Sequence, residues 1–145
     1  MTLNQWLNDG RLKPHTTSKQ EIDQLLEAVE RNIKDASIEA LSSDNRFNIA
    51  YQAILQLATI ALYVKGYRPV ASKGHHYITI QSLAYTIGID MTEQVAYFDH
   101  CRTLRNTAEY ERAGIVSDGA LEELLDELED FKKQVLDWLS AHYGY

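Results

Sequence analysis

The segment from Ser43 to Val64 constrains the fold most strongly, because it predicts a helix that is apolar around most of its circumference. Ser43 is a suitable N-cap, and Gly66 just beyond the segment is a typical C-terminal stop. A helix of this kind is usually central in a domain, so other helices must surround it. Its apolar positions recur at spacings of three and four residues: Phe47, Ala50, Ile54, Leu57, Ala61 and Val64.

The same segment argues against a membrane span. Its most apolar part, residues 49–64, is shorter than the roughly 20 apolar residues that cross a bilayer, and polar residues interrupt it. We therefore expect a buried helix and no membrane partner. Its polar side chains must face a cleft, a partner subunit or a hydrogen-bonded interior, because burying them unpaired is costly. They form one stripe along the helix: Asn48, Gln52, Gln56, Thr59 and Tyr63.

Four other segments have the apolar spacing of amphipathic helices. The first begins with Ser18 and Glu21, which match a capping box, and Thr92 and Ser117 are N-cap candidates for the last two. The loop GYRPVASKGHHY separates the central helix from the next one. With the central helix included, the expected spans run from about 18 to 41, 43 to 66, 77 to 88, 92 to 114 and from 117 onward.

These segments predict an all-α fold, an antiparallel bundle of about five helices that forms a single domain at residues 18–145. No segment has convincing strand alternation. Residues 1–17 have weak periodicity, and we interpret them as an irregular N-terminal arm. With 45% hydrophobic and 24% charged residues, the chain resembles ordinary globular proteins rather than disordered ones.

The distribution of charge limits the kind of partner. A net charge of −7 argues against a protein that coats nucleic acid through bulk attraction. Most of this charge lies after Ser117, where eight acidic residues accompany two lysines, and we interpret this run as a solvated helix face. A local basic surface near Arg68 and Lys73 remains compatible with a small anionic site.

Cysteine usage and the start of the chain favour the cytoplasm. The one cysteine, Cys101, cannot form an internal disulfide, and we expect it in the core as a packing residue. The N-terminal sequence MTLNQWLNDGRLK has neither an apolar signal core nor a small-residue cleavage site.

The helix expected from Thr92 carries the one polar cluster without an obvious structural need, in the run CRTLRNTAEYER. At about 100° per residue, Arg102 and Asn106 share a stripe away from the apolar face, with Arg105 at its border. Tyr110 lies about 140° from Arg105 around the helix, so the two do not share one face. A two-fold related helix would bring second copies of both groups into one cleft, which favours a homodimer.

The bundle and this motif resemble the HEPN superfamily (higher eukaryote and prokaryote nucleotide-binding). The resemblance covers most of the chain, from the first expected helix to the last. Ribonuclease members of that family carry an Arg, a polar residue, three variable positions and a His late in the sequence. Arg105 and Asn106 match the first two positions, and Tyr110 stands where the His would be.

The resemblance implies a metal-independent site without a cofactor, in which Arg105, Asn106 and Tyr110 form a degenerate catalytic motif. Arg105 would hold a phosphate bidentately. Cleavage needs a base for the ribose 2′-hydroxyl proton, and tyrosine, with an ordinary pKa of about 10, is a poorer base than histidine. We therefore expect binding of RNA or nucleotide phosphate with degenerate or weak ribonuclease activity, in a toxin–antitoxin or defence setting. An active endoribonuclease using Arg105 and Tyr110, or a purely structural protein-interaction module, are the alternatives.

The resemblance also implies a partner. In the ribonuclease toxins of this family a Tyr often follows the His by two residues and is modified by a partner nucleotidyltransferase. Arg112 stands at that position here, so the chain departs from the pattern. A nucleotidyltransferase-like antitoxin is nevertheless the partner that the family suggests.

The candidate phosphate-binding residues also have structural interpretations. The arginines would then only pair with Asp99, Glu109 or the acidic last helix, and Tyr110 would be a core aromatic. The two histidines are adjacent, hence expected to point apart, and no HxxxH or CxxC spacing supports a metal site. The candidates are Arg102, Arg105, Arg68, Lys73, His75 and His76.

Overall fold

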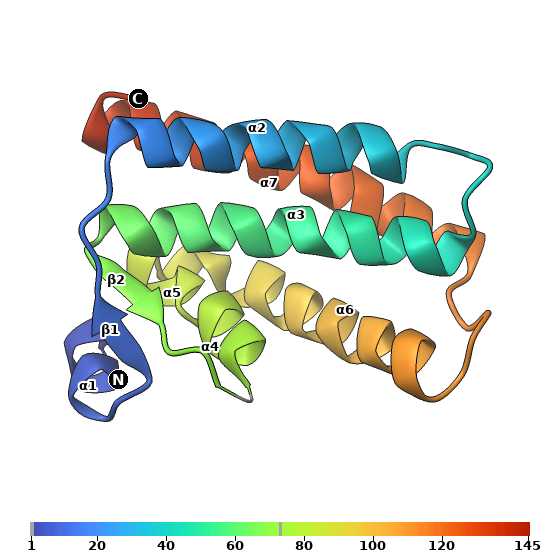
Figure 1. Ribbon diagram of the computed structural model, residues 1–145, viewed down its shortest axis with the longest axis horizontal. Coiled ribbons are helices and arrows are strands. Elements are labelled where there is room, and N and C mark those ends of the chain that lie inside the picture. Colours follow the sequence, from blue (N-terminus) through green and yellow to red (C-terminus); the bar gives the residue numbers. More distant parts are fainter. Residues whose placement is uncertain (1, 73) are drawn as a thin grey trace.

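The computed structural model describes residues 2–72 and 74–145, and its main elements are helices, which confirms the all-α fold class (Figure 1). Four helices are long, and the others flank them. The long helices are α2 (Lys19–Ala36), α3 (Ser43–Val64), α6 (Thr92–Tyr110) and α7 (Asp118–Tyr143). The shorter elements are α1 (Leu3–Asn8), β1 (Leu12–Pro14), β2 (Tyr67–Pro69), α4 (His75–Gln81), α5 (Leu83–Thr86) and a 3₁₀ turn (Ile89–Met91).

Helix α3 lies at the centre of the bundle, as its sequence predicts. Helices α2 and α7 cover it on one side, and α4, α5 and α6 cover it on the other (Figure 1). Side chains on several faces of α3 are therefore excluded from solvent, including Tyr51, Ile54 and Leu57. By length and composition α3 also passes for a membrane-crossing helix, but 61% of its most apolar window is buried inside the protein. Its hydrophobicity is thus accounted for by core packing.

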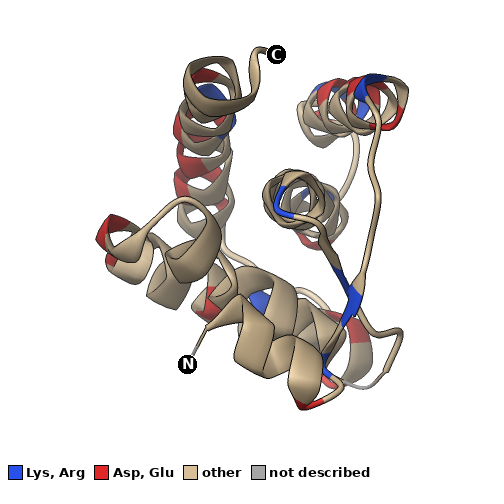
Figure 2. Ribbon diagram, turned by 90° about the vertical axis from the view of Figure 1, so that its left-hand side faces the viewer, with Lys and Arg blue, Asp and Glu red and all other residues tan. Residues whose placement is uncertain are grey.

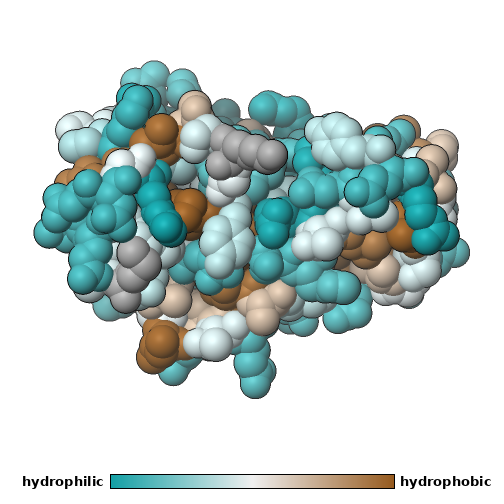
Figure 3. Space-filling view, turned by 90° about the horizontal axis from the view of Figure 1, so that it is seen from below, coloured by the Kyte–Doolittle hydropathy of each residue, from teal (hydrophilic) through white to brown (hydrophobic). Residues whose placement is uncertain are grey.

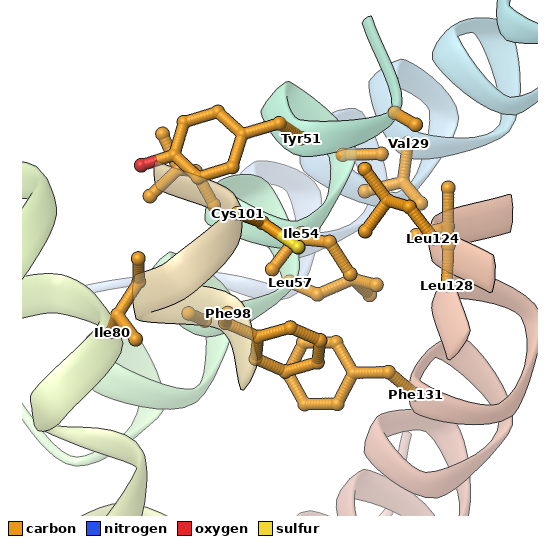
Figure 4. Close-up of a cluster of buried hydrophobic side chains, with 14 of the residues drawn as sticks. Val29, Tyr51, Ile54, Leu57, Ile80, Phe98, Cys101, Leu124, Leu128 and Phe131 are labelled. Carbon is orange, nitrogen blue, oxygen red and sulfur yellow. The ribbon is translucent and has the colours of Figure 1, made fainter. Parts of the chain in front are cut away.

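Aromatic side chains connect α6 to α7 within the core. The ring centroids of Phe98 and Phe131 lie 4.9 Å apart, and both residues are fully buried (Figure 4). Cys101 lies in the same cluster, which confirms its expected position, and burial raises the pKa of its thiol to about 12. A thiol that stays protonated is a poor nucleophile, so Cys101 serves in packing.

The N-terminal arm is ordered, and the expectation of an irregular segment is wrong. The Thr2 hydroxyl accepts a hydrogen bond from the backbone N–H of Gln5, and the Gln5 side chain caps Thr2 in return, which starts α1. Strand β1 then pairs antiparallel with β2, with Leu12 opposite Pro69. Trp6 and Leu12 are buried against Leu62 of α3. The strands are only three residues long, too short for alternation to reveal them in the sequence.

Two helix starts differ from the sequence-based expectation. Ser42 rather than Ser43 caps α3, and the Ser43 hydroxyl instead donates to the Asp118 carboxylate at the start of α7. Thr92 opens α6 without capping it, since its hydroxyl donates back to the Ile89 carbonyl. The Ser43 hydroxyl thus has a partner on another helix, and the Thr92 hydroxyl has one in the preceding turn. The cap pattern of the sequence specifies neither partner.

Three other helix boundaries also differ from the sequence-based expectation. Helix α2 ends at Ala36 rather than near residue 41, and the third expected helix is divided into α4 and α5 at Ser82. Helix α6 ends at Tyr110, before the expected stop near Gly114. Beyond this end, the Asp44 carboxylate accepts hydrogen bonds from the backbone N–H groups of Gly114 and Val116 at 2.6 and 3.1 Å. This contact ties the α6–α7 connection to the start of α3.

Removing one core ring tests this packing. Phe131→Ala should lower the free energy of unfolding by about 3–5 kcal/mol, because it leaves a cavity between α6 and α7. Urea denaturation followed by circular dichroism measures the change. Tyr110→Ala is the matched control: Tyr110 is 75% exposed, so its loss should change stability by no more than about 0.5 kcal/mol. Equal effects of the two substitutions would contradict this account of the core.

Candidate functional site

A cleft of about 660 Å³ opens between α4 and α6. It lies on the side of the molecule shown in Figure 3, where the surface is mostly hydrophilic and apolar side chains are scattered. Residues from the two helices face each other across it. His75, His76 and Tyr77 come from α4, and Arg102, Arg105, Asn106 and Tyr110 come from α6. The fold thus gathers most of the residues that the sequence singled out.

Arg105 is held in place by two hydrogen bonds and one ion pair of its guanidinium. Nε donates to Oδ1 of Asn48 on α3 at 2.8 Å, and Nη1 donates to Oδ1 of Asn106 at 3.1 Å. Nη2 lies 3.3 Å from a carboxylate oxygen of Glu109, and the guanidinium lies over the Tyr51 ring, 5.7 Å from its centroid. The side chain is only 13% exposed. The expected pairing with Glu109 is therefore present, and Asn106 has a specific hydrogen-bonding role.

Arg102 is more exposed than Arg105, and within the described part of the chain the terminal nitrogens of its guanidinium are free to bind a ligand. Its Nε donates to Oδ1 of Asp99 at 2.8 Å, and its side chain is 26% exposed. The guanidinium carbon lies 5.6 Å from the centre of the Tyr77 ring. Among the residues that the structure describes, none accepts a hydrogen bond from Nη1 or Nη2 of Arg102. These two nitrogens match the forked geometry that binds a phosphate.

His76 is paired with a buried tyrosine beneath the cleft. Its Nδ1 lies 3.3 Å from the Tyr51 hydroxyl, which is at the edge of the core cluster in Figure 4. Burial, followed by the nearby charges of His75, Arg105 and Arg102, lowers the pKa of His76 to about 4. Burial also raises the pKa of Tyr51, although Arg105 and Arg102 oppose the shift. At neutral pH the imidazole is therefore uncharged, and the phenol keeps its proton and can donate it to Nδ1.

His75 lies beside His76, and the expectation that the two point apart is wrong. Their ring centroids are 4.4 Å apart, and both line the cleft. Nδ1 of His75 lies 3.0 Å from the Ser72 carbonyl, which can only accept, so Nδ1 carries a proton. A neutral His75 then has its lone pair on Nε2. The Tyr51 hydroxyl can donate to Nδ1 of His76 or accept from it, so this contact allows either tautomer of His76. In the tautomer whose Nδ1 accepts, Nε2 of His76 carries the proton, and the pair combines an acceptor with a donor.

Tyr110 is neither in the core nor separated from Arg105. It is 75% exposed, and it lines the same cleft because the cleft follows α6 over its last turns. A second subunit is therefore not needed to bring Arg105 and Tyr110 into one cleft.

Two of the residues predicted to bind phosphate do not contribute to the described cleft. Arg68 lies on β2 opposite Lys13 and is not among the residues that line it. Lys73 lies outside the described residues. Within the described part of the chain, no group of three or more His, Cys, Asp or Glu residues is placed to hold a metal ion.

The structure adds three residues to the site that sequence reasoning did not assign to it. Asn48 and Tyr51 of α3 support Arg105 and His76 from below, and Tyr77 of α4 lies against Arg102. Asn48 belonged to the polar stripe expected to face a cleft or a hydrogen-bonded interior, so a signal existed for it. No sequence signal assigned Tyr51 to the cleft, because its position in α3 is indistinguishable from that of a core residue.

Comparison of the chain with protein-family models, with curated proteins and with solved structures found no match. The geometry of the cleft is therefore the basis for any functional conclusion.

The depressed pKa of His76 predicts a stability that depends on pH. The unfolded chain binds a proton as pH falls below about 6.5, whereas the folded protein resists protonation of His76 until about pH 4. Stability from this group is thus present above pH 6.5 and lost progressively on acidification toward pH 4. Urea denaturation at a series of pH values should show a steeper loss for the wild type than for His76→Gln.

The ring resonance of His76 gives an independent check by NMR. A titration midpoint near 4 is expected, and a midpoint near the ordinary value of 6.5 would contradict the buried, uncharged imidazole. Equal pH dependence of the wild type and His76→Gln would contradict it as well.

Proposed function

We propose that the cleft between α4 and α6 binds a phosphate group of RNA or of a nucleotide. One observation carries the proposal: Arg102 and Arg105 line the same cleft as His75 and His76, although the two pairs come from different helices. Arginine forks and imidazole N–H groups are suitable donors to phosphate oxygens. A cleft of about 660 Å³ is also within the usual size of small-ligand sites.

Acidic residues around the cleft reduce the positive charge that the two arginines bring to it. Asp99 and Glu109 each neutralise part of one arginine, and Glu111 also lines the cleft. A phosphate would use the terminal nitrogens of Arg102 and compete with Glu109 for Arg105. The acidic positions of α7 lie on another part of the molecule and do not line the cleft (Figure 2). A modest affinity that depends on salt is expected for such a site.

The proposal includes the setting that the HEPN resemblance implies: a homodimeric cytoplasmic protein of a toxin–antitoxin or defence system, paired with a nucleotidyltransferase-like antitoxin. The helical fold and the Arg105–Asn106 hydrogen bond are compatible with this setting. Sedimentation velocity tests the homodimer, and a purely monomeric protein would remove it from the proposal.

Substitution of the arginines tests phosphate binding. Arg102→Gln and Arg105→Lys should each weaken binding of a labelled, non-cleavable 2′-O-methyl RNA by about tenfold, since each removes charge-assisted hydrogen bonds to phosphate. Fluorescence anisotropy at fixed salt measures the affinity. Arg68→Gln is the matched control and should bind like the wild type, because Arg68 lies outside the cleft.

Two results would overturn this proposal. One is a wild-type protein that binds none of the RNA; the other is a cleft variant whose affinity equals that of Arg68→Gln. Circular dichroism melting curves of each variant separate lost binding from lost folding, which matters for Arg105 because it supports Asn48 and Asn106.

RNA cleavage is the second candidate function, and the placement of His75 and His76 favours it. The sequence motif lacks its histidine, but α4 supplies two imidazoles to the same cleft. Nε2 of His75 can take the proton from a ribose 2′-hydroxyl, which attacks the adjacent phosphorus. The departing 5′-oxygen needs a proton, which His76 can give only in its imidazolium form, giving a 2′,3′-cyclic phosphate and a 5′-hydroxyl. A pKa of about 4 makes this form rare at neutral pH. The low pKa of His76 and the pairing of both arginines favour a slow reaction.

Cleavage of end-labelled RNA by the purified protein tests this candidate. We expect slow cutting by the wild type, a loss of about 100-fold in His75→Gln and His76→Gln, and a similar loss in Arg105→Ala. Tyr110→His places an imidazole at the motif position. If the wild type is inert and Tyr110→His cuts, the α4 histidines do not substitute for the motif residue.

A further inference from the structure

Two tyrosines on the rim of the cleft are exposed although the core of this protein accommodates large rings. Tyr77 of α4 is 42% exposed and Tyr110 of α6 is 75% exposed, whereas Tyr51 beneath them is fully buried. Exposed aromatic rings beside arginines are typical of surfaces on which nucleic-acid bases stack. The guanidinium of Arg102 already lies against the Tyr77 ring, with its carbon 5.6 Å from the ring centre.

The two rings lie at separate places along the cleft. Arg102, which marks the position of Tyr77, precedes Tyr110 by eight residues on α6, a rise of about 12 Å along the helix axis. Neighbouring bases in one strand of a duplex are spaced by about 3.4 Å. Two adjacent stacked bases therefore cannot reach both rings, so a strand that contacts both tyrosines uses bases that are splayed apart or that are not neighbours.

We propose that Tyr77 and Tyr110 form two stacking sites for unpaired bases, so that the ligand of the cleft is single-stranded RNA. The inference rests on the proposed binding of phosphate by Arg102 and Arg105. Along α6, Arg102 lies beside Tyr77, and Arg105 lies between Arg102 and Tyr110. The arginines hold the backbone of the strand, and the tyrosines hold bases on either side of the bound phosphate. The arrangement tolerates different sequences, because every base has a π-face.

Two other phosphate-containing ligands, a duplex and a free mononucleotide, fit this site less well. A duplex keeps its bases paired inside the helix, so it offers only its backbone to the arginines. A free mononucleotide has one base and reaches one tyrosine at a time. The protein should therefore bind single-stranded RNA more tightly than it binds either the mononucleotide or the duplex.

A binding experiment with matched ligands and variants tests the inference. The probe is a fluorescein-labelled 2′-O-methyl oligoadenylate, used single-stranded and annealed to its complement, with adenosine monophosphate and an abasic oligomer of equal length as competitors. Tyr77→Ala and Tyr110→Ala should each weaken binding of the single strand by about tenfold. Binding of the abasic oligomer should stay unchanged. Tyr110→Phe should bind like the wild type, because the ring rather than the hydroxyl stacks.

Tyr85→Ala is the control for removing an exposed tyrosine. Tyr85 is 39% exposed, packs against Trp6 and does not line the cleft, so its loss should leave RNA binding unchanged. Melting curves of all variants establish that they are folded.

The outcomes separate this inference from the proposed function. If the tyrosine variants bind the single strand normally, or if the wild type binds the duplex equally well, the stacking sites do not exist while phosphate binding stands. If the tyrosine variants lose the abasic oligomer as strongly as the oligoadenylate, the rings act on the backbone and the inference is overturned. If the wild type binds none of the ligands, the proposed function fails and takes the inference with it.

Discussion

The enclosure of α3 is the constraint on which the rest of this protein depends. A helix that is apolar on most sides must be covered on most sides, and α2, α7 and the α4–α6 segment provide that cover. The same helix also forms the base of the cleft, since Asn48 supports Arg105 and Tyr51 supports His76. The floor of the cleft therefore belongs to the same helix as the centre of the core, which favours a site whose geometry exists before a ligand arrives.

The two arginines of the cleft differ in how many partners they have within the protein. Arg105 donates to two amide oxygens and pairs with Glu109, so its orientation is fixed but its charge is partly neutralised. Arg102 has one carboxylate partner and two free terminal nitrogens among the described contacts. The buried arginine thus organises the site, and the more exposed one is available to a ligand. In the proposed phosphate site, such a division would limit the affinity and favour a phosphate whose shape fits the free nitrogens.

The imidazole pair shows how the tertiary fold changes the chemistry that a sequence motif implies. In the motif that the HEPN resemblance suggests, Tyr110 stands at the position of a histidine, and a tyrosine is a poor base near neutral pH. In the folded protein α4 brings His75 and His76 into the same cleft as the arginines, where they contact the Ser72 carbonyl and the Tyr51 hydroxyl. The linear motif contains no imidazole, whereas the cleft contains two.

The sequence by itself determined the all-α class, the central position of α3, the burial of Cys101 and the helix that carries Arg102, Arg105 and Asn106, because these depend on periodicity and composition along one segment. It did not determine the paired strands β1 and β2, the Ser43–Asp118 hydrogen bond or the attachment of the α6–α7 connection to Asp44, which depend on contacts between segments far apart in the chain. The cleft is the clearest case. Its residues come from α3, α4 and α6, and only the packing angle between these helices decides which side chains meet.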